Sequence, residues 1–244
     1  RLRCIEINID GTKNVLEYAL QGNLKKIVFA SSSEVYGEPI DERLTESSVT
    51  YGKTVYAITK LAGEELCKAY HQRFPEFRYT ILRYFNTYGI CQPAQFVVPK
   101  FIQRAREGLS PIIYGDGSQI RSYCYASDTA WATVESLIEN RADGEILNVA
   151  NPEHPVSLIK LAELVIQTVG KAGSLSPRIE GDFSHTDRAR SREVFRRVCD
   201  ITKARNMLGY QPKVSLEAGL RMVASQKDIF SRWTRTDIDY SLDE

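Results

Sequence analysis

The sequence of 244 residues has almost no net charge, no closely paired cysteines and no long apolar run. Its 32 lysines and arginines nearly cancel its 31 aspartates and glutamates, so no long-range field is available to hold a nucleic-acid backbone or an anionic membrane surface. The five cysteines are scattered without a C-x-x-C pair, which argues against a disulfide framework and a structural zinc site. No apolar stretch approaches the roughly 20 residues of a membrane span. These absences favour a cytoplasmic protein that recognises a small ligand and uses no metal.

The chain also lacks the usual start of a complete protein. It opens at Arg1, with neither an initiator methionine nor a signal peptide. We therefore expect that a segment preceding Arg1 is missing from this sequence.

The first third of the chain alternates between helix and strand. Residues 3–20 place apolar side chains at helical spacing, and the short apolar run 26–30 predicts a strand that is buried on both faces. Residues 56–74 form an amphipathic pattern, and 79–85 are rich in β-branched and aromatic types. This alternation predicts an α/β fold with a doubly wound parallel sheet. Polar residues 31–33 follow the first strand, where such sheets bind their ligands.

The remainder of the chain alternates less regularly. The helices and strands expected there are 97–107, 112–114, 127–139, 146–149 and 157–169. Ser157 is the expected N-cap of the last helix. The strongly charged stretch 178–197 is expected to be a surface loop.

Tyr56 and Lys60 form the first constellation that could carry chemistry. An i, i+4 pair lies on one face of a helix, so the Lys60 ammonium can sit beside the Tyr56 phenol. A nearby cation favours ionisation of a phenol, whose ordinary pKa is about 10. A hydroxyl from the serine cluster 31–33 could complete a site that deprotonates a substrate alcohol. Taken alone, the same pattern more often marks a surface helix with a solvated lysine.

Seven segments in a fixed order place this pair in a wider context. They are residues 8–15, 31–37, 56–60, 82–89, 98–101, 114–122 and 200–210. Their order and spacing resemble the extended short-chain dehydrogenase/reductase family, and more narrowly its NAD-dependent nucleotide-sugar epimerase and dehydratase branch. The likeness covers nearly all of residues 4–224.

The resemblance implies a Rossmann-like sheet whose N-terminal part is missing, followed by a smaller C-terminal α/β substrate domain. Residues 1–92 would be the C-terminal part of the NAD-binding domain and carry the catalytic motif. Residues 93–236 would be mainly the nucleotide-sugar domain, with some segments returning to the first domain. Residues 237–244 would be a tail.

The resemblance also implies roles for single residues. Tyr56 corresponds to the catalytic base, Lys60 to the cation that lowers its pKa and binds the nicotinamide ribose, and Ser32 to the residue that hydrogen-bonds the sugar hydroxyl. The residues implied near NAD are Asn8, Ser31, Tyr56, Lys60 and Tyr84. The residues implied near a nucleotide-diphosphate sugar are Ser32, Asn86, Val98, Arg121 and Arg190, of which Arg190 belongs to the loosest motif match.

Glu34 departs from the pattern of the 4-epimerases, which usually carry a small residue there. The 4,6-dehydratases and UDP-glucuronate decarboxylases carry an acid at this position. Glu34 lies two residues beyond Ser32, so on an extended chain both side chains point to the same face. Its carboxylate could therefore remove the C5 proton of a 4-keto sugar. However, residues 57–59 differ from the decarboxylase pattern, and Ser33 differs from the dehydratase pattern. We therefore predict 4-epimerisation through a transient 4-keto sugar, with Glu34 as a candidate catalytic residue and dehydration or decarboxylation as alternatives.

Two departures from the family pattern keep a third possibility open. The glycine-rich turn that approaches the cofactor pyrophosphate does not occur in this sequence. The connection 90–97 is shorter than usual, and Cys91 stands where an arginine is common. A non-catalytic protein could keep the fold to bind a nucleotide sugar or a partner, although intact Ser32, Tyr56 and Lys60 argue against it.

Two predicted helices, 12–20 and 56–74, match the pair that forms a homodimer interface in many members of the family. Tyr18, Leu66 and Tyr70 would then offer a partly apolar surface to a two-fold partner. The alternative is that these side chains pack only within the chain.

Overall fold

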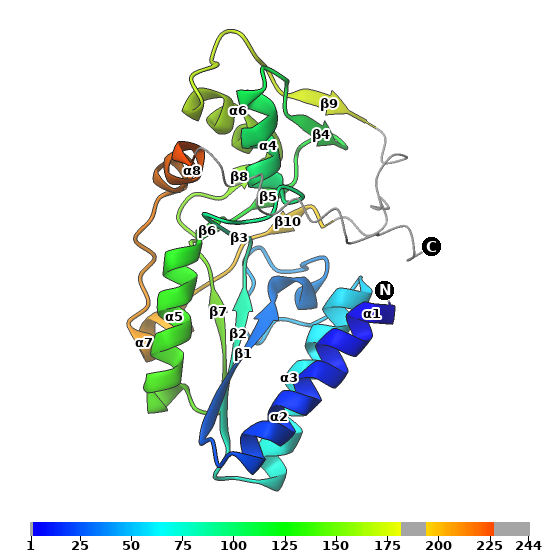
Figure 1. Cartoon of the computed structure of the whole chain (residues 1–244), viewed down its shortest axis with the longest axis vertical. Helices are drawn as coiled ribbons and strands as arrows, with labels where there is room; N and C mark the ends of the chain where they lie inside the picture. The colour runs from blue at the N-terminus through cyan, green and yellow to red at the C-terminus, as the bar shows by residue number, and fades with distance from the viewer. Residues whose placement is uncertain (1, 182–193, 227–244) are drawn as a thin grey trace.

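A three-stranded parallel sheet forms the centre of the larger lobe in the computed structural model, which describes residues 2–181 and 194–226 (Figure 1). Strand β1 (Lys26–Ser32) pairs with β2 (Arg78–Tyr84), and β2 pairs with β7 (Glu145–Val149). The register aligns Ser32 with Tyr84 at the carboxyl edge of the sheet. The predicted parallel α/β fold is confirmed.

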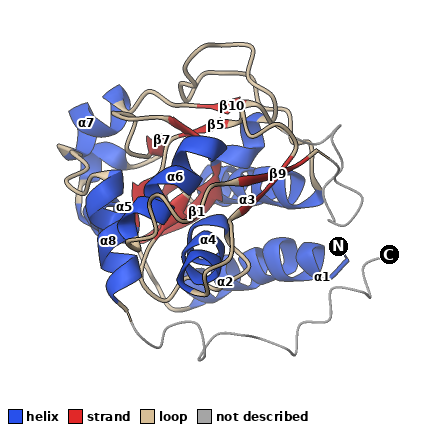
Figure 2. Cartoon of the chain, turned by 90° about the horizontal axis from the view of Figure 1, so that it is seen from above, coloured by secondary structure: helices blue, strands red, loops and turns tan. Residues whose placement is uncertain are grey.

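Helices cover both faces of this sheet (Figures 1 and 2). One face carries α2 (Gly11–Gln21) and α3 (Val55–Arg73), and the other carries α5 (Ala126–Ile138) and α7 (Thr202–Leu208). The predicted helix 3–20 is continuous in direction but consists of α1 (Leu2–Ile5), a wider turn (Glu6–Asp10) and α2. Neighbouring side chains of β2 enter different cores, because residues alternate across a strand: Ile81 packs on the α3 side and Leu82 on the α5 side.

The smaller lobe packs three helices around its own apolar core (Figure 1). These helices are α4 (Val97–Arg106), α6 (Leu158–Thr168) and α8 (Leu216–Ser225). Their inward side chains include Phe101, Ile102, Leu161, Val165 and Leu220. The predicted N-cap of α6 is confirmed, since the Ser157 hydroxyl accepts a hydrogen bond from the Lys160 N–H at 3.1 Å.

Short strands lie between the two lobes and along the smaller lobe (Figure 1). They pair as β3 (Thr87–Tyr88) with β6 (Cys124–Tyr125), β4 (Ile112–Tyr114) with β9 (Arg178–Glu180), and β5 (Ile120–Arg121) with both β8 (Val156–Ser157) and β10 (Arg196–Arg197).

The charged stretch 178–197 is not wholly a loop, which corrects the sequence-based expectation. Its first residues form β9 and its last form β10. Strand β9 pairs with β4, and β10 pairs with β5. The edges of β4 and β5 would otherwise leave backbone N–H and C=O groups unpaired. Residues 182–193 and the predicted tail 237–244 lie outside the described residues. The proposed division of the chain near residue 92 remains a prediction.

Candidate active site

The candidate site lies at the carboxyl edge of the main sheet, where β1 ends and α3 begins. Ser32 is the last residue of β1, and Tyr56 is in the first turn of α3. Helix α3 starts there because Thr54 adopts extended backbone angles and its hydroxyl accepts a hydrogen bond from the Ala57 N–H at 3.1 Å. The chain thus brings Tyr56 toward the strand end at a fixed helical position.

The structure brings Ser32, Tyr56 and Lys60 together, as predicted. The Ser32 side chain lies close enough to Tyr56 to lower the pKa of its phenol. The Lys60 ammonium lies 5.6 Å from the centroid of the Tyr56 ring and donates to the Ala30 carbonyl oxygen at 3.0 Å. A hydroxyl, a phenol and an ammonium from two elements therefore share one edge of the sheet.

A close approach between β1 and α3 supports the Lys60 side chain. The Lys60 ammonium lies 5.4 Å from the centroid of the Phe29 ring. The same ring packs against Gly63 so closely that a Cβ atom there would lie 2.3 Å from it. Any larger residue at Gly63 would push Phe29 or the helix away, and Lys60 would move with them.

The pKa of the Tyr56 phenol is raised, which corrects the expectation of a lowered value. Burial is the largest cause, and the charges of Glu34 and Cys4 act in the same direction. The hydrogen bond with Ser32 lowers the pKa but does not outweigh them. Burial also lowers the pKa of Lys60. Desolvation therefore affects the pKa values of Tyr56 and Lys60 more than the proximity of the two side chains does.

Glu34 lies in the same site, next to Ser32 and the start of α3. It follows β1 in a short 3-10 turn (Ser33–Tyr36), and its N–H donates to the Ser32 hydroxyl at 3.2 Å. Its carboxylate accepts a hydrogen bond from the Thr54 hydroxyl at 3.3 Å. These two contacts hold Glu34 beside the start of α3, where its charge raises the pKa of Tyr56.

The residues predicted to lie near a cofactor have different surroundings. The Asn8 amide donates to the Thr59 hydroxyl at 2.9 Å, beside Lys60 on α3. Ser31 is only 3% exposed, and its hydroxyl donates to the Glu64 carboxylate at 2.5 Å. The Ser31 side chain is thus occupied inside the fold, which leaves its backbone for any contact with a ligand. The Tyr84 hydroxyl is hydrogen-bonded to Thr133 of α5 at 2.8 Å.

The residues predicted to bind the substrate are distributed over the junction and the smaller lobe. Asn86 adopts a positive φ of 34°, which asparagine tolerates better than most residues, and its amide donates to the Ser122 carbonyl at 3.1 Å. Val98 is 1% exposed in the core of the smaller lobe, so its side chain cannot meet a ligand without rearrangement. The Arg121 guanidinium donates to the carbonyl oxygens of Ile120 and Val194. Arg190 lies outside the described residues.

Sequence reasoning missed two contributions to the site. Thr54 both caps α3 and contacts Glu34, and a threonine just before a helical pattern is a recognisable cap signal. The buried pair of Glu64 and Arg83 could not be found from spacing, because its members lie on different elements 19 positions apart.

The family model of GDP-mannose 4,6-dehydratase matches residues 2–223. The chain belongs to this family. It is 36% identical over 229 residues to a UDP-N-acetyl-alpha-D-glucosaminuronate decarboxylase of Bacillus cytotoxicus, with 90% of this chain and 68% of that protein covered. It is 27% identical to a UDP-glucuronate 4-epimerase of Thermodesulfobacterium geofontis, with 96% and 67% covered.

Solved structures of nucleotide-sugar epimerases share the fold of this member of the GDP-mannose 4,6-dehydratase family. The UDP-glucose 4-epimerase of Thermotoga maritima, with UDP-glucose, has a TM-score of 0.81 at 28% identity over 91% of this chain and 69% of that one. The UDP-glucuronic acid 4-epimerase of Bacillus cereus, in complex with UDP-glucuronic acid and NAD, has a TM-score of 0.79 at 29% identity over 91% and 67%. The chain thus spans about two thirds of relatives whose names describe different reactions.

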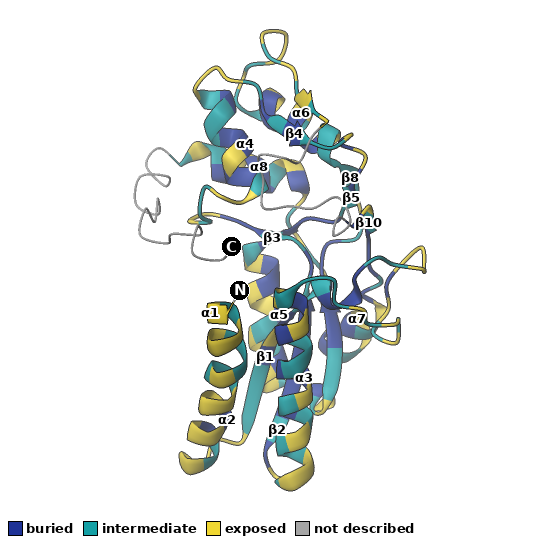
Figure 3. Ribbon diagram, turned by 90° about the vertical axis from the view of Figure 1, so that its right-hand side faces the viewer, coloured by how far each residue is buried: buried dark blue, intermediate teal, exposed yellow. Residues whose placement is uncertain are grey.

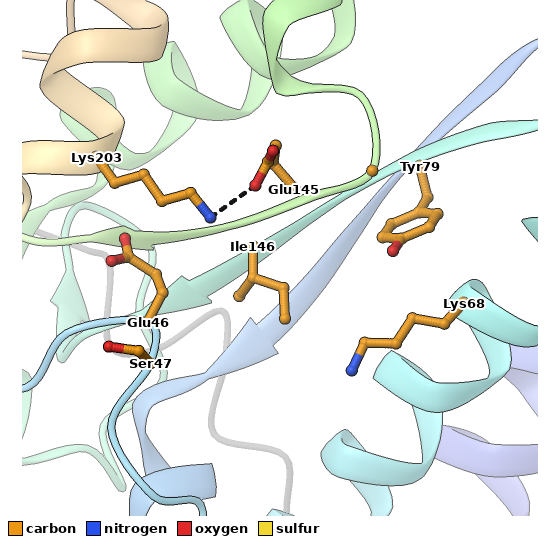
Figure 4. Close-up of a pocket in the computed structure, with 8 residues that line it drawn as sticks. Glu46, Ser47, Lys68, Tyr79, Glu145, Ile146 and Lys203 are labelled. Atoms are coloured by element: carbon orange, nitrogen blue, oxygen red, sulfur yellow. Dashed lines mark ion pairs between the residues drawn. The ribbon is translucent and has the colours of Figure 1, made fainter.

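A pocket of about 400 Å³ lies elsewhere, on the α3 side of β2 and β7 (Figure 4). Its lining consists of Glu46, Ser47, Lys68, Tyr79, Gly144, Glu145, Ile146 and Lys203. The Lys203 ammonium and the Glu145 carboxylate are already paired at 2.7 Å. No predicted site residue within the described ranges contributes to this pocket, so it is separate from the candidate active site.

Other kinds of site are not evident in residues 2–181 and 194–226. No three His, Cys, Asp or Glu side chains lie where they could hold a metal ion. Those residues also include no helix with the length and apolar character needed to cross a membrane.

Proposed function

We propose that the full-length protein containing this chain is an NAD-dependent 4-epimerase of a nucleotide-diphosphate sugar. The observation that carries the proposal is the meeting of Ser32, Tyr56 and Lys60 at the carboxyl edge of the sheet. A partly desolvated phenol beside an ammonium and a serine hydroxyl suits proton exchange with a substrate alcohol.

The residues present fit the nicotinamide-ribose end of NAD. An ammonium has three donors, and within the described residues Lys60 uses one of them on the Ala30 carbonyl. The remaining donors can bind ribose hydroxyls beside Tyr56, which is 39% exposed. When bound, NAD supplies the acceptor for the hydride that leaves C4 and returns it later.

The chain's own groups account for the proton steps. Ser32 holds the 4-hydroxyl of the sugar, and Tyr56 takes its proton as the C4–H bond breaks. The resulting 4-keto sugar presents its other face, and Tyr56 gives the proton back to the oxygen when the C4–H bond forms again. The sugar is therefore inverted at C4 with no net oxidation.

The smaller lobe provides the groups that we expect to hold the diphosphate. Asn86 lies at the junction between the lobes, and Arg121 is the last residue of β5. A guanidinium presents paired donors that match phosphate oxygens. We propose that Arg121 and Arg190 both serve this purpose.

Decarboxylation of a nucleotide-linked uronate is the second candidate, because Glu34 lies within the site. In that reaction the 4-keto group allows the C5–C6 bond to break, CO₂ leaves, and C5 takes a proton in its place. In the corresponding dehydration, a base removes the C5 proton as water leaves from C5 and C6. Glu34 can serve as the acid or base in either case, and the Bacillus cytotoxicus relative is named as a decarboxylase.

The test compares the wild-type full-length protein with Glu34→Gln, using UDP-, dTDP- and GDP-linked hexoses and uronates. A 4-epimerase keeps most of its activity in Glu34→Gln, because its chemistry needs no group at C5. In a decarboxylase or dehydratase, the Glu34→Gln variant still transfers hydride to NAD but does not release product, so NADH accumulates on the enzyme. Glu38→Gln is the matched control, since that carboxylate pairs with Lys53 outside the Tyr56 site. A folded wild-type protein that binds these sugars without turnover would instead support a non-catalytic role.

A further inference from the structure

A buried ion pair lies directly behind the candidate active site. The side chains of Glu64 on α3 and Arg83 on β2 are only 1% and 4% exposed. The Arg83 Nε and Nη2 atoms donate to the two carboxylate oxygens of Glu64 at 2.9 and 2.7 Å. Two parallel charge-assisted hydrogen bonds fix both the distance and the orientation of the partners. The proposed proton and hydride steps use neither residue.

Glu64 attaches the catalytic helix to the end of β1. Its carboxylate accepts a hydrogen bond from Ser31 at 2.5 Å, immediately before Ser32 in the chain. One helical turn earlier, Lys60 donates to the carbonyl of Ala30 at 3.0 Å. Successive residues of β1 are therefore bonded to successive turns of α3, which fixes how far the helix sits along the strand.

Arg83 extends the same attachment to the turn that carries Glu34. Its guanidinium lies 4.8 Å from the centroid of the Tyr36 ring, and its Nη1 donates to the Glu46 carbonyl at 3.3 Å. Tyr36 ends the 3-10 turn that contains Glu34, and its hydroxyl donates to Asn148 of β7 at 2.7 Å. The pair thus contacts every segment that supplies a proposed catalytic side chain.

Stability alone is a weak reason to bury such a pair. Removing two charges from water is costly, and well-packed apolar residues often replace a buried ion pair without loss. Burial alone would lower the pKa of Arg83, but the hydrogen bonds and charge of Glu64 together with Tyr36 raise it. Apolar side chains could not reproduce the two parallel hydrogen bonds that fix the geometry of this pair.

We propose that Glu64 and Arg83 are positioning residues, which set the distance between the Tyr56–Lys60 pair on α3 and Ser32 at the end of β1. The inference rests on the proposed function, since it requires these three side chains to act on one substrate. It adds that their alignment is set inside the fold by the two hydrogen bonds from Arg83 to Glu64.

The first variant is Arg83→Lys in the full-length protein. This substitution keeps the positive charge and removes the two parallel hydrogen bonds to Glu64. We expect kcat to fall by about 10- to 100-fold, because small misplacements of reacting groups have effects of that order. KM and NAD affinity should change little. Displacing Ser32 removes a hydrogen bond that lowers the pKa of Tyr56, so the acid side of the kcat profile should move to higher pH.

Arg78→Lys is the matched control. Arg78 lies at the other end of the same strand, and its side chain is 38% exposed where it pairs with Asp143 at 2.8 Å. This variant should keep the wild-type kcat and pH profile. An Arg83→Lys protein that also keeps both would overturn the positioning role while leaving the proposed function intact.

A second variant covers the case in which Arg83→Lys does not fold. The double substitution Glu64→Gln with Arg83→Gln leaves no unpaired buried charge, and circular dichroism can establish its fold. A folded double variant should show the same loss of kcat and the same pH shift. If neither variant folds, the pair is needed for folding and the positioning role is wrong. A folded wild-type protein without turnover would remove both this inference and the proposed function.

Discussion

Tyr56 stands between groups that shift its pKa in opposite directions. Burial and the charges of Glu34 and Cys4 raise the pKa, and the hydrogen bond with Ser32 lowers it. A partly desolvated phenol keeps its proton at neutral pH unless an opposing charge or a donor favours the phenolate. Ionisation of Tyr56 therefore depends on what lies directly beside its hydroxyl.

The Tyr56→Phe variant removes only that hydroxyl. We expect turnover to fall by about 10² to 10⁴-fold, the usual contribution of a general acid or base, while the thermal unfolding curve stays unchanged. Steady-state assays with the nucleotide sugar identified for the wild type provide the measurement. Tyr51→Phe is the control, since Tyr51 is 69% exposed in the loop before α3 and should tolerate the change. Retention of more than half the wild-type rate by Tyr56→Phe would remove the catalytic assignment.

The two neighbours of Tyr56 should move its titration in opposite directions. Ser32→Ala removes a hydrogen bond that lowers the pKa of Tyr56, so the acid side of the kcat profile should shift to higher pH. Glu34→Gln removes a negative charge that raises the pKa of Tyr56, so the same limb should shift to lower pH. Residual rates measured across the pH range test both signs. Shifts in the same direction would contradict this account of the site.

Helix α3 depends on its first turn for both stability and geometry. The Thr54 hydroxyl accepts from the Ala57 N–H and donates to the Glu34 carboxylate. We expect Thr54→Ala to lower the free energy of unfolding by about 0.5–2 kcal/mol, as for other N-caps, and also to reduce turnover. Denaturant unfolding and kinetic assays measure the two effects separately.

Ser157→Ala is the matched control for Thr54, because Ser157 caps α6 in the other lobe through the Lys160 N–H. It should lose a similar amount of stability and keep its kcat. Equal losses of activity in both variants would mean that Thr54 acts only through stability.

The regular elements were predictable because their patterns are local. The strands 26–30 and 79–85 and the helix 56–74 follow from periodicity, and each lies within two residues of the observed element. Strands β9 and β10 were missed because each has only two or three residues, two of them charged, and gains strand geometry only by pairing with a distant edge. The meeting of Ser32 with Tyr56 followed from family resemblance. The raised pKa of Tyr56 and the Glu64–Arg83 pair depend on burial, which no spacing reveals.

The outer surface of α2 and α3 is where we predict a second copy of the protein to bind. Figure 3 shows exposed residues along these helices, and Tyr18 is 72% exposed. Leu66 and Tyr70 are partly buried against the core of the larger lobe. Beside Tyr70 lies a hollow of about 420 Å³, lined by Glu17, Leu20, Ala69, Tyr70, Arg73 and Phe74. A two-fold partner would cover this region with the same helices.

Sedimentation of the full-length protein at micromolar concentration tests this assembly. The wild type should sediment as a dimer, and Tyr18→Glu should shift it toward the monomer because it places a charge in an apolar contact. Val134→Glu, at a 58% exposed position of α5 on the opposite side, should leave the dimer intact. A monomeric wild type would overturn the predicted dimer.

Transfer of hydride from and back to C4 is the central claim, and isotopic labelling tests it most directly. The full-length protein, loaded with NAD, is incubated with UDP-glucose and UDP-glucuronate that carry deuterium at C4, and the products are resolved by mass and NMR. We predict a product that retains the deuterium at C4, whether it is epimerised or decarboxylated, and a rate about 10² to 10⁴-fold lower for Tyr56→Phe. A product that has exchanged its C4 deuterium for solvent hydrogen, or that Tyr56→Phe forms at the wild-type rate, would contradict the account.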